Sequence, residues 1–372
     1  MVERCGLALF HGEIKRMINL AELRESDAPY IIAEIGCNHN GDLDLAKQMI
    51  RGAKECGCQA VKFQLWEQKN LFTKKYLQDL NDGIIRLENV SEWKTKELGL
   101  NNIFDQVRAF SIGEKEHGEL FDFARELKID YSSTAVTKEG VDFLIDQKVA
   151  FVKLASMDVN NPDLLEYLIA KDYPALISLG MASLDEIKRL VKMVPSKYRK
   201  NIVLLHCVSL YPPKDEMVNL KVIKALRGQF KMAIGFSDHS LGCAISLAAV
   251  ALGTRVIEKH FTLDKNLPGW DHKVSADPKE MAALCRESRR IVTALGDGRK
   301  ELSPDEIQKR LKFRRSLVAA RKLASGEIIK KEDIAVKRPG TGIAPDELTK
   351  VVGRKVKTSI EEDELIEWEK LS

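Results

Sequence analysis

The sequence lacks the features that mark membrane, exported and nucleic-acid-binding proteins. No apolar run approaches the length of a transmembrane helix. The stretch Met1–Phe10 holds Glu3 and Arg4, and its apolar part is too short for a signal peptide. Neither sign of charge predominates: the chain has 59 basic and 55 acidic residues, which gives a net charge of only +4. We therefore expect a cytoplasmic protein with neither a membrane surface nor a nucleic acid among its partners.

Cysteines are few and show no pairing pattern. The seven cysteines are an odd number and are scattered along the chain. Cys56 and Cys58 form a C-x-C pair, but no second pair follows at the spacing of a zinc site. This distribution predicts reduced thiols, in agreement with a cytoplasmic protein. The composition is otherwise ordinary for a globular protein, with 44% apolar and 31% charged residues. A chain of 372 residues is long enough for one large domain and a smaller one.

Eight short apolar runs, rich in β-forming residues, recur along most of the chain. They hardly alternate with polar residues, as expected for strands buried on both faces. Helix start signals, such as Asn161-Pro162 and the capping box Ser183–Glu186, lie between most of them. Eight strand–helix units over about 270 residues predict a (β/α)8 TIM barrel of the α/β class, with an open doubly wound sheet as the alternative. The runs are Tyr30–Gly36, Ala60–Leu65, Asp130–Ala135, Phe151–Ala155, Ala175–Leu179, Ile202–Val208, Met232–Phe236 and Thr254–Lys259.

The chain changes character near Gly296, where a second part begins. The predicted parts are an N-terminal extension (1–29), the barrel (30–296), a linker (297–315) and a small β-rich domain (316–372). A basic helix is predicted at Asp305–Arg314, and the long crossover 66–113 is predicted to form an insertion at the barrel rim. A domain of about 60 residues is near the lower limit for independent stability, so we expect it to pack on the barrel or on a partner's barrel. Its predicted strands are Ser316–Ala320, Gly326–Ile329, Ile334–Val336 and Val351–Val356.

Polar side chains follow the predicted strands where they end, and in a barrel all these ends meet at one rim. His239 and His260 end neighbouring strands, an arrangement that suits a divalent metal. Lys62 and Lys153 lie within apolar strands, where lysine is rare unless it is paired, and with nearby serines they suit a phosphate and a carboxylate. The other rim residues are Glu34, Asn38, His39, Gln64, Ser156, Asp158, Ser178, Ser209, Tyr211, Ser237 and Glu258.

This combination predicts a site for an anionic phosphorylated substrate and for a carbonyl group that a metal polarises. The carboxylates are available for proton transfer. A single strand-end histidine more often has a structural role. His206 lies inside an apolar run and is therefore predicted to be a core histidine, while His11 and His117 are given no function.

Seven segments, in order along almost the whole chain from about Tyr30, resemble the sialic acid synthase family. In the tail, Val336–Gly342 resembles the C-terminal antifreeze-like (SAF) domain of that family. The family condenses phosphoenolpyruvate with an N-acylated hexosamine, usually N-acetylmannosamine, to give a nine-carbon 2-keto acid (N-acetylneuraminate) and phosphate. The segments are Ile32–Gly41, Val61–Gln64, Lys153–Ser156, Leu204–Cys207, Tyr211-Pro212, Gly235–His239 and Ile257–Thr262.

The resemblance implies roles at the phosphoenolpyruvate end of the site. Ser209 is a further substrate-binding candidate, at a position where some bacterial members have asparagine. Asp158 stands where some members have glutamate, which sets its carboxylate one methylene further back. By resemblance, the acid–base or orienting residues are Glu34, Asp158 and Glu258. The residues around phosphoenolpyruvate are Lys62, Lys153, Ser156, Ser178, Tyr211 and Ser237.

The resemblance also implies how the sugar is held. His239 and His260 would bind Mn2+, with Mg2+ or Co2+ as alternatives, and the ion would polarise the sugar aldehyde. Gln64 and Asp271 would contact the sugar itself. Arg338 would reach the acyl group from the SAF domain of the other subunit, which makes the expected assembly a domain-swapped homodimer.

Several alternatives stay open at this point. A legionaminic or other nonulosonic acid synthase would use the same chemistry on a diacetamido sugar, and the bulky Trp270 beside Asp271 could alter the sugar pocket. A 3-deoxy-octulosonate or heptulosonate phosphate synthase shares the barrel and phosphoenolpyruvate, but the SAF-like tail argues against it. A binding protein without catalytic activity is a different class of function, and the intact lysines, histidines and carboxylates argue against that.

Overall fold

The structure is a computed structural model that describes residues 23, 27–82, 84 and 108–372. Most of the predicted extension 1–29 and half of the insertion 66–113 lie outside the described residues, as does His11. The six cysteines of the described part are all free thiols. No helix in these ranges is long and apolar enough to cross a membrane. The chain divides into two compact units, one ending at Gly296 and one beginning at Asp297.

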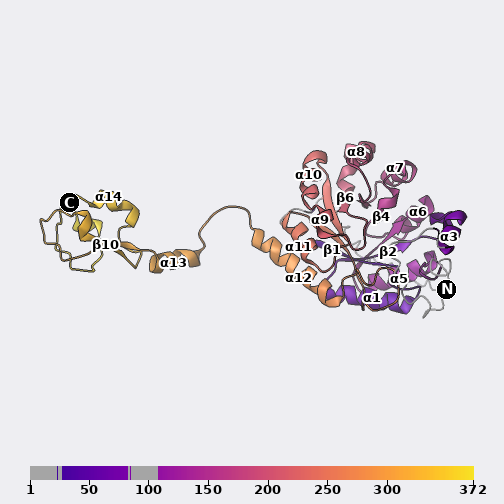
Figure 1. The fold of residues 1–372 in the computed structure, drawn as a ribbon, viewed down its shortest axis with the longest axis horizontal. Helices are drawn as coiled ribbons and strands as arrows, with labels where there is room; N and C mark the ends of the chain where they lie inside the picture. The colour runs from indigo at the N-terminus through magenta and orange to yellow at the C-terminus, as the bar shows by residue number, and fades with distance from the viewer. Residues whose placement is uncertain (1–22, 24–26, 83, 85–107) are drawn as a thin grey trace, which may run out of the picture. The chain divides into compact units, whose positions relative to one another are not determined.

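The first unit is a closed barrel of eight parallel strands. Each strand pairs with its neighbour along the chain, and β8 returns to β1. This closed order confirms the predicted fold class and excludes the open doubly wound sheet. Figure 1 shows the strands at the centre of this unit with the helices around them. The strands are β1 (Tyr30–Gly36), β2 (Ala60–Leu65), β3 (Asp130–Ala135), β4 (Val152–Leu154), β5 (Ala175–Ser178), β6 (Ile202–Cys207), β7 (Ala233–Asp238) and β8 (Val256–His260).

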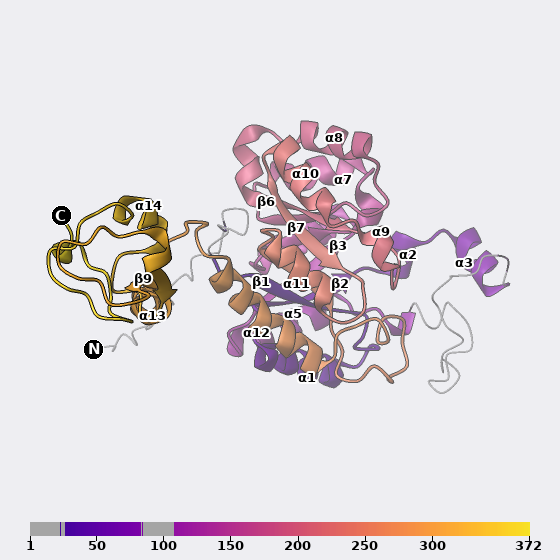
Figure 2. The ribbon, with the colours of Figure 1, turned by 60° about the vertical axis from the view of Figure 1, so that its left-hand side comes forward.

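Helices surround the barrel, and side-chain caps fix where several of them begin. The Asp42 carboxylate accepts hydrogen bonds from the first turn of α1, and capping boxes at Ser183 and Asp277 begin α8 and α12. Helix α12 packs against both α1 and α11 (Figure 2), which closes the helical layer. The helices of the barrel layer are α1 (Leu43–Cys56), α5 (Glu114–Glu126), α6 (Lys138–Asp146), α7 (Pro162–Ala170), α8 (Leu184–Met193), α10 (Lys221–Phe230), α11 (Ala244–Ala251) and α12 (Pro278–Leu295). Shorter helices in the connections are α2 (Gln68–Leu71), α3 (Lys74–Asn81) and α9 (Asp215–Val218).

Side chains that point into the barrel change from apolar to polar along the strands. On β8, Val256 belongs to an apolar cluster, and the next residues on the same face, Glu258 and His260, line a cavity. On β2, Ala60 is followed in the same way by Lys62 and Gln64. The barrel is therefore closed by apolar side chains below and is polar at the carboxyl ends of its strands. The apolar cluster consists of Tyr30, Ile32, Ala60, Phe151, Leu176, Val203, Leu205 and Val256.

The strand boundaries differ slightly from the predicted ones. Strand β7 continues through Ser237 and Asp238, and β8 includes His260, whereas the predicted runs stopped earlier. The last residue of β7 is the charged Asp238, which pairs with Lys259 of β8. Both side chains are buried, so the two strands accommodate the charges beside each other.

The second unit is small and contains little regular structure. Strands β9 (Ser316–Ala319) and β10 (Ile334–Lys337) form an antiparallel pair, and helix α13 (Pro304–Phe313) precedes them. The strand predicted at Val351–Val356 is wrong, because Val351 ends helix α14 (Leu348–Val351) and Gly353 then turns the chain at φ +88°. Gly326–Ile329 contributes only an isolated bridge, at Ile328. Short apolar runs do not distinguish helix from strand.

Candidate active site

A cavity of about 430 Å³ opens at the carboxyl ends of the barrel strands. Its size suits a small-molecule substrate, and thirteen of the fifteen predicted site residues line it. Cavity-lining residues that sequence reasoning did not single out include Cys37, Thr134 and Cys207. The thirteen are Glu34, Lys62, Gln64, Lys153, Ser156, Ser178, Ser209, Tyr211, Ser237, His239, Glu258, His260 and Asp271.

Four buried charges form the base of the cavity. Lys62 Nζ lies 2.7 Å from Glu34 Oε2 and donates a hydrogen bond of 3.0 Å to Thr134 Oγ1. Glu258 lies between the two lysines, with one oxygen 3.8 Å from Lys62 Nζ and the other 4.0 Å from Lys153 Nζ. It also accepts a hydrogen bond of 2.9 Å from Ser237 Oγ. Two buried ammonium groups that line one cavity suit a ligand that carries negative charge, although Glu34 and Glu258 also contact them.

Burial shifts the pKa values of these groups in different directions. It raises the pKa of Glu34 to about 7, because desolvation and the Glu258 charge outweigh the attraction of Lys62. For Glu258 the two lysines outweigh burial and lower its pKa to about 2. Burial also lowers the pKa of Lys153. At neutral pH Glu258 is therefore ionised, whereas Glu34 is divided between its two protonation states and can give or take a proton.

The two histidines lie side by side at the rim, their ring centroids 5.5 Å apart. His239 Nδ1 donates to the carbonyl oxygen of Val208 at 2.8 Å, which leaves Nε2 as the unprotonated nitrogen of a neutral ring. His260 Nδ1 is buried without a hydrogen-bond partner and lies 3.7 Å from Asp271 Oδ2. Burial lowers the pKa of both histidines. Tyr211 stacks on the His239 ring at 4.1 Å and so fixes its plane.

These nitrogen atoms fit a divalent metal. A neutral imidazole with a free lone pair is the form that binds a metal, and a buried polar atom without a partner is costly unless something binds it. His239 and His260 supply such atoms, and Asp271 adds a carboxylate beside them. Within the described ranges no three His, Cys, Asp or Glu side chains gather as a complete ligand set. A metal held by the two rings would thus keep coordination positions for substrate and water.

Serine hydroxyls and one glycine shape the wall beside Lys153. The Ser156 hydroxyl accepts a hydrogen bond from the Gly180 backbone N–H at 3.0 Å and lies 3.2 Å from Cys207 Sγ. A Cβ atom at Gly180 would come within 2.2 Å of Ser209 Oγ and 2.7 Å of Ser156 Oγ. Only glycine lets these side chains approach so closely. The sequence offered no signal for this role, because Gly180 carries no functional group.

The outer part of the cavity combines a few polar groups with apolar ones. Gln64 donates a 3.0 Å hydrogen bond to Glu34 Oε1 and accepts one from the Trp66 indole at 3.3 Å. Trp270 packs edge-on against Phe110, with ring centroids 5.1 Å apart. The apolar side chains that line the cavity with them are Trp66, Leu71, Phe72, Met157 and Met181. Such a wall suits the carbon skeleton of a sugar more than an additional charged group.

Several residues singled out in the sequence are not among those that line the cavity. Asp158 accepts a hydrogen bond from Asn161, and burial raises the pKa of its carboxyl group, so its catalytic role stays a prediction. Asn38 is buried and donates to the Phe261 carbonyl and to Ser275. His39 accepts a hydrogen bond from the Gly41 N–H. Arg338 belongs to the second unit, where it is exposed and its guanidinium lies 5.1 Å from the Phe313 ring centroid.

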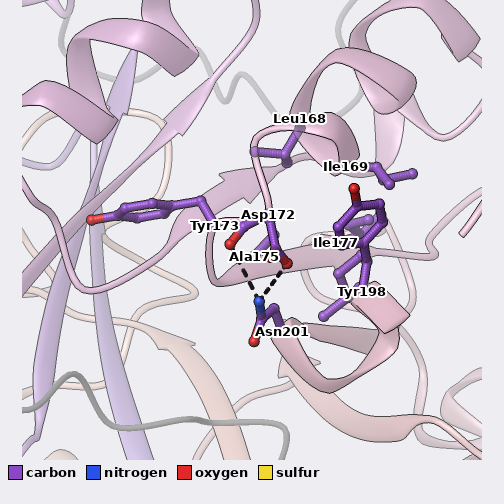
Figure 3. Close-up of a pocket in the computed structure, with 9 residues that line it drawn as sticks. Leu168, Ile169, Asp172, Tyr173, Ala175, Ile177, Tyr198 and Asn201 are labelled. Carbon is purple, nitrogen blue, oxygen red and sulfur yellow. Dashed lines mark hydrogen bonds between the residues drawn. The ribbon is translucent and has the colours of Figure 1, made fainter. Parts of the chain in front are cut away.

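Two further histidines lie away from the cavity lining: His206, predicted to be a core histidine, and His117, which was given no function. His206 is buried and hydrogen-bonds the Val218 carbonyl at 2.7 Å, and His117 is buried against the Tyr131 hydroxyl. A second depression, near α7 and β5, is closed by apolar side chains and a hydrogen-bonded pair (Figure 3). There the Asn201 amide donates to the Asp172 carboxylate and carbonyl. It leaves almost no volume for a ligand and gathers no chemically reactive groups, so the barrel mouth remains the candidate site.

Comparison with known proteins gives consistent results over nearly the whole chain. The NeuB family matches residues 49–300, and the SAF domain matches residues 314–372. N,N'-diacetyllegionaminic acid synthase of Legionella pneumophila is 38% identical over 91% of this chain and 94% of its own length. Human N-acetylneuraminate-9-phosphate synthase is 38% identical over 91% of each chain. The crystal structure of N-acetylneuraminic acid synthetase from Leptospira borgpetersenii, in complex with citrate, superposes with a TM-score of 0.65 and 33% identity, over 76% of this chain and 90% of that one.

Proposed function

Because the chain belongs to the NeuB family, an enzyme family of the sialic acid synthase type, we propose that it condenses phosphoenolpyruvate with an N-acyl hexosamine. The products are a nine-carbon 2-keto acid (a nonulosonic acid) and inorganic phosphate. The observation that carries this proposal is that two lysines and two histidines line the same cavity. Lys62 and Lys153 form an anion-binding base, and His239 and His260 stand above it at the rim.

Phosphoenolpyruvate occupies the base of the cavity in this proposal. Its phosphate and carboxylate are balanced by Lys62 and Lys153, and hydroxyl groups of Ser156, Ser178 and Ser237 donate hydrogen bonds to its oxygen atoms. Burial supports this arrangement, because Lys62 and Lys153 are 2% and 3% exposed and act in a medium of low dielectric constant. The narrow wall at Gly180 orients the ligand so that its C3 carbon faces the rim.

The sugar aldehyde is placed at the rim, within reach of C3. A divalent ion held by His239 and His260, with Mn2+ as our first choice, would polarise the aldehyde oxygen and so make its carbon a better electrophile. C3 attacks that carbon, and the aldehyde oxygen becomes a hydroxyl group. The cationic character left at C2 is stabilised by the Glu258 carboxylate. Water then adds at C2, and phosphate leaves by cleavage of the C–O bond.

Glu34 is the proposed proton carrier. Its pKa of about 7 means that the carboxyl group exists in both forms at neutral pH. It contacts both the Lys62 ammonium group at the base and the Gln64 amide near the rim, so it borders both substrates. We propose that Glu34 donates a proton to the developing hydroxyl group or accepts one from the attacking water.

The acceptor is N-acetylmannosamine or a close N-acyl hexosamine. A diacetamido sugar of the legionaminic acid type is the second candidate, and the apolar outer wall favours it. Trp270, Phe72 and Met181 offer surface for methyl and acetamido groups. In the described part of the lining, the only cationic side chains besides the histidines are Lys62 and Lys153 at the base, so a phosphate on the sugar would lack a partner there.

Phosphate release from phosphoenolpyruvate tests this function. The protein is first freed of metal with a chelator and then assayed with Mn2+ and each of four sugars. These are N-acetylmannosamine, its 6-phosphate, and the diacetamido sugars that precede legionaminic and pseudaminic acids. We expect release with one unphosphorylated sugar, a product mass equal to sugar plus pyruvate, and no activity in Lys153→Ala. A folded protein that releases no phosphate with any of them would refute the proposal.

We further propose that the active enzyme is a domain-swapped homodimer in which Arg338 reaches the acyl group of sugar bound to the partner subunit. The exposure of this guanidinium group supports the idea. Mixing Arg338→Ala with Lys153→Ala tests it, because hybrid dimers would contain one site with neither change. We expect the mixture to regain part of the wild-type activity after subunit exchange. Exchange that is demonstrated by mass spectrometry but restores no activity would contradict a shared site.

A further inference from the structure

A buried ion pair lies directly behind the two rim histidines. Asp238 and Lys259 are paired positions on the neighbouring strands β7 and β8, and each immediately precedes one histidine. Their side chains point away from the cavity, because Ser237 and His239 on one strand, and Glu258 and His260 on the other, are the residues that line it. The Lys259 ammonium group lies 3.0 Å from Asp238 Oδ2, and both side chains are 1% exposed.

The pair is part of a hydrogen-bond network in which both Asp238 oxygen atoms and the Lys259 ammonium group have partners. Asp238 Oδ1 accepts from the Ser240 backbone N–H at 2.9 Å and from the Ser240 hydroxyl at 2.6 Å. Asp238 Oδ2 accepts from the Ser246 hydroxyl of α11 at 2.5 Å. Lys259 Nζ also donates to the Ser240 carbonyl at 2.8 Å. The network therefore joins β7, β8, the turn after His239 and the following helix.

Stability alone does not account for charges at this place. The layer between strands and helices is largely apolar, and two well-packed apolar residues are often as stable there as a buried ion pair. What an ion pair adds is a defined geometry, because Asp238 and Lys259 satisfy each other only at one separation and one register of β7 and β8. The residues whose positions depend most directly on that register are His239 and His260.

We propose that Asp238 and Lys259 are positioning residues that set the separation and orientation of the His239 and His260 rings for metal binding. The inference rests on the proposed function, since it concerns the metal that this function requires. Asp238 holds the backbone on both sides of His239 through its bonds to Ser240. Lys259 ties the residue before His260 to the same turn. Partners that orient metal-binding histidines commonly change metal affinity by about 10–100-fold when they are removed.

The test is the Mn2+ affinity of the metal-free, full-length protein, measured by titration calorimetry. The double variant Asp238→Asn/Lys259→Met removes both charges at similar side-chain size, so no unpaired charge is left buried. We expect it to fold, to bind phosphoenolpyruvate with nearly unchanged affinity, and to bind Mn2+ at least tenfold more weakly than the wild type. Ser246→Ala removes one bond to Asp238 without changing any charge, and we expect about threefold weaker Mn2+ binding.

A control variant separates positioning from general destabilisation. Leu190→Ala on α8 empties part of the barrel's outer core and should lower the melting temperature while leaving Mn2+ affinity unchanged. The proposal is overturned if the folded double variant binds Mn2+ with an affinity within twofold of the wild type. If the double variant does not fold, the proposal is overturned when Ser246→Ala binds Mn2+ with an affinity within twofold of the wild type. If the wild type itself binds no Mn2+, the metal in the proposed function is refuted together with this role of the pair.

Discussion

Replacing Glu34 by glutamine should change how the stability of the protein depends on pH. In the unfolded chain the Glu34 carboxyl group holds its proton up to about pH 4.5, and in the folded protein up to about pH 7. Between pH 4.5 and pH 7 the folded state binds more protons than the unfolded state, so the free energy of unfolding falls as pH rises. One pH unit corresponds to about 1.4 kcal/mol, so full ionisation of Glu34 costs the folded protein about 3 kcal/mol. Glutamine cannot ionise, so the stability of Glu34→Gln should not fall with pH for this reason.

The measurement is urea unfolding of both proteins from pH 5 to pH 8.5. We expect the wild type to lose about 2 to 3 kcal/mol relative to Glu34→Gln over that range. Any constant effect of the amide on Lys62 and Gln64 cancels, because only the change with pH is compared. The variant should also lose at least about a hundredfold in kcat if Glu34 carries a proton. Parallel stability curves would refute the raised pKa, and unchanged kcat at its optimum pH would refute the proton-carrying role.

Three other predictions address the cavity wall, the rim and the scaffold. Gly180→Ala should raise the KM for phosphoenolpyruvate at least tenfold and cost about 1–3 kcal/mol of stability, because Ser209 and Ser156 must move. Steady-state phosphate release measures the KM and urea unfolding measures the stability. An unchanged KM would contradict the role of the glycine. Trp270→Ala should alter the KM for the sugar and not for phosphoenolpyruvate, since its ring lines the outer cavity; equal changes in both would argue against separate subsites. Ser183→Ala should cost about 1 kcal/mol by removing the α8 cap without affecting kcat; a loss of activity at full stability would contradict a purely structural cap.

The barrel and most of its mouth were predictable because their physical signals are local. Residues such as Val256 and Ala60 lie on apolar runs of strand length, and the polar residues that follow them in sequence line one cavity. Lys62 and Lys153 were informative because lysine inside an apolar strand requires a partner. The structure supplies those partners in Glu34 and Glu258.

What escaped prediction depends on contacts between distant parts of the chain. The Asp238–Lys259 pair was not predicted, because only the register of β7 with β8 brings the two charges together. Gly180 was missed because its role is the absence of a side chain. The Val351–Val356 run was predicted as a strand although it begins at a helix end, since a few apolar residues can be buried equally well in either form.

The apolar lower half of the barrel has a consequence for the order of events in a catalytic cycle. Because the cavity is closed below by residues such as Leu176 and Val203, ligands can arrive and depart only through the mouth. In the proposed arrangement, a molecule held by the buried Lys62 and Lys153 lies beneath a sugar bound near Trp270 and Asp271, which line the same cavity. For the proposed reaction we therefore expect phosphoenolpyruvate to arrive before the sugar, and phosphate to depart after the nine-carbon product. If the proposed placement of the substrates is right, the scaffold imposes an ordered sequence of binding and release.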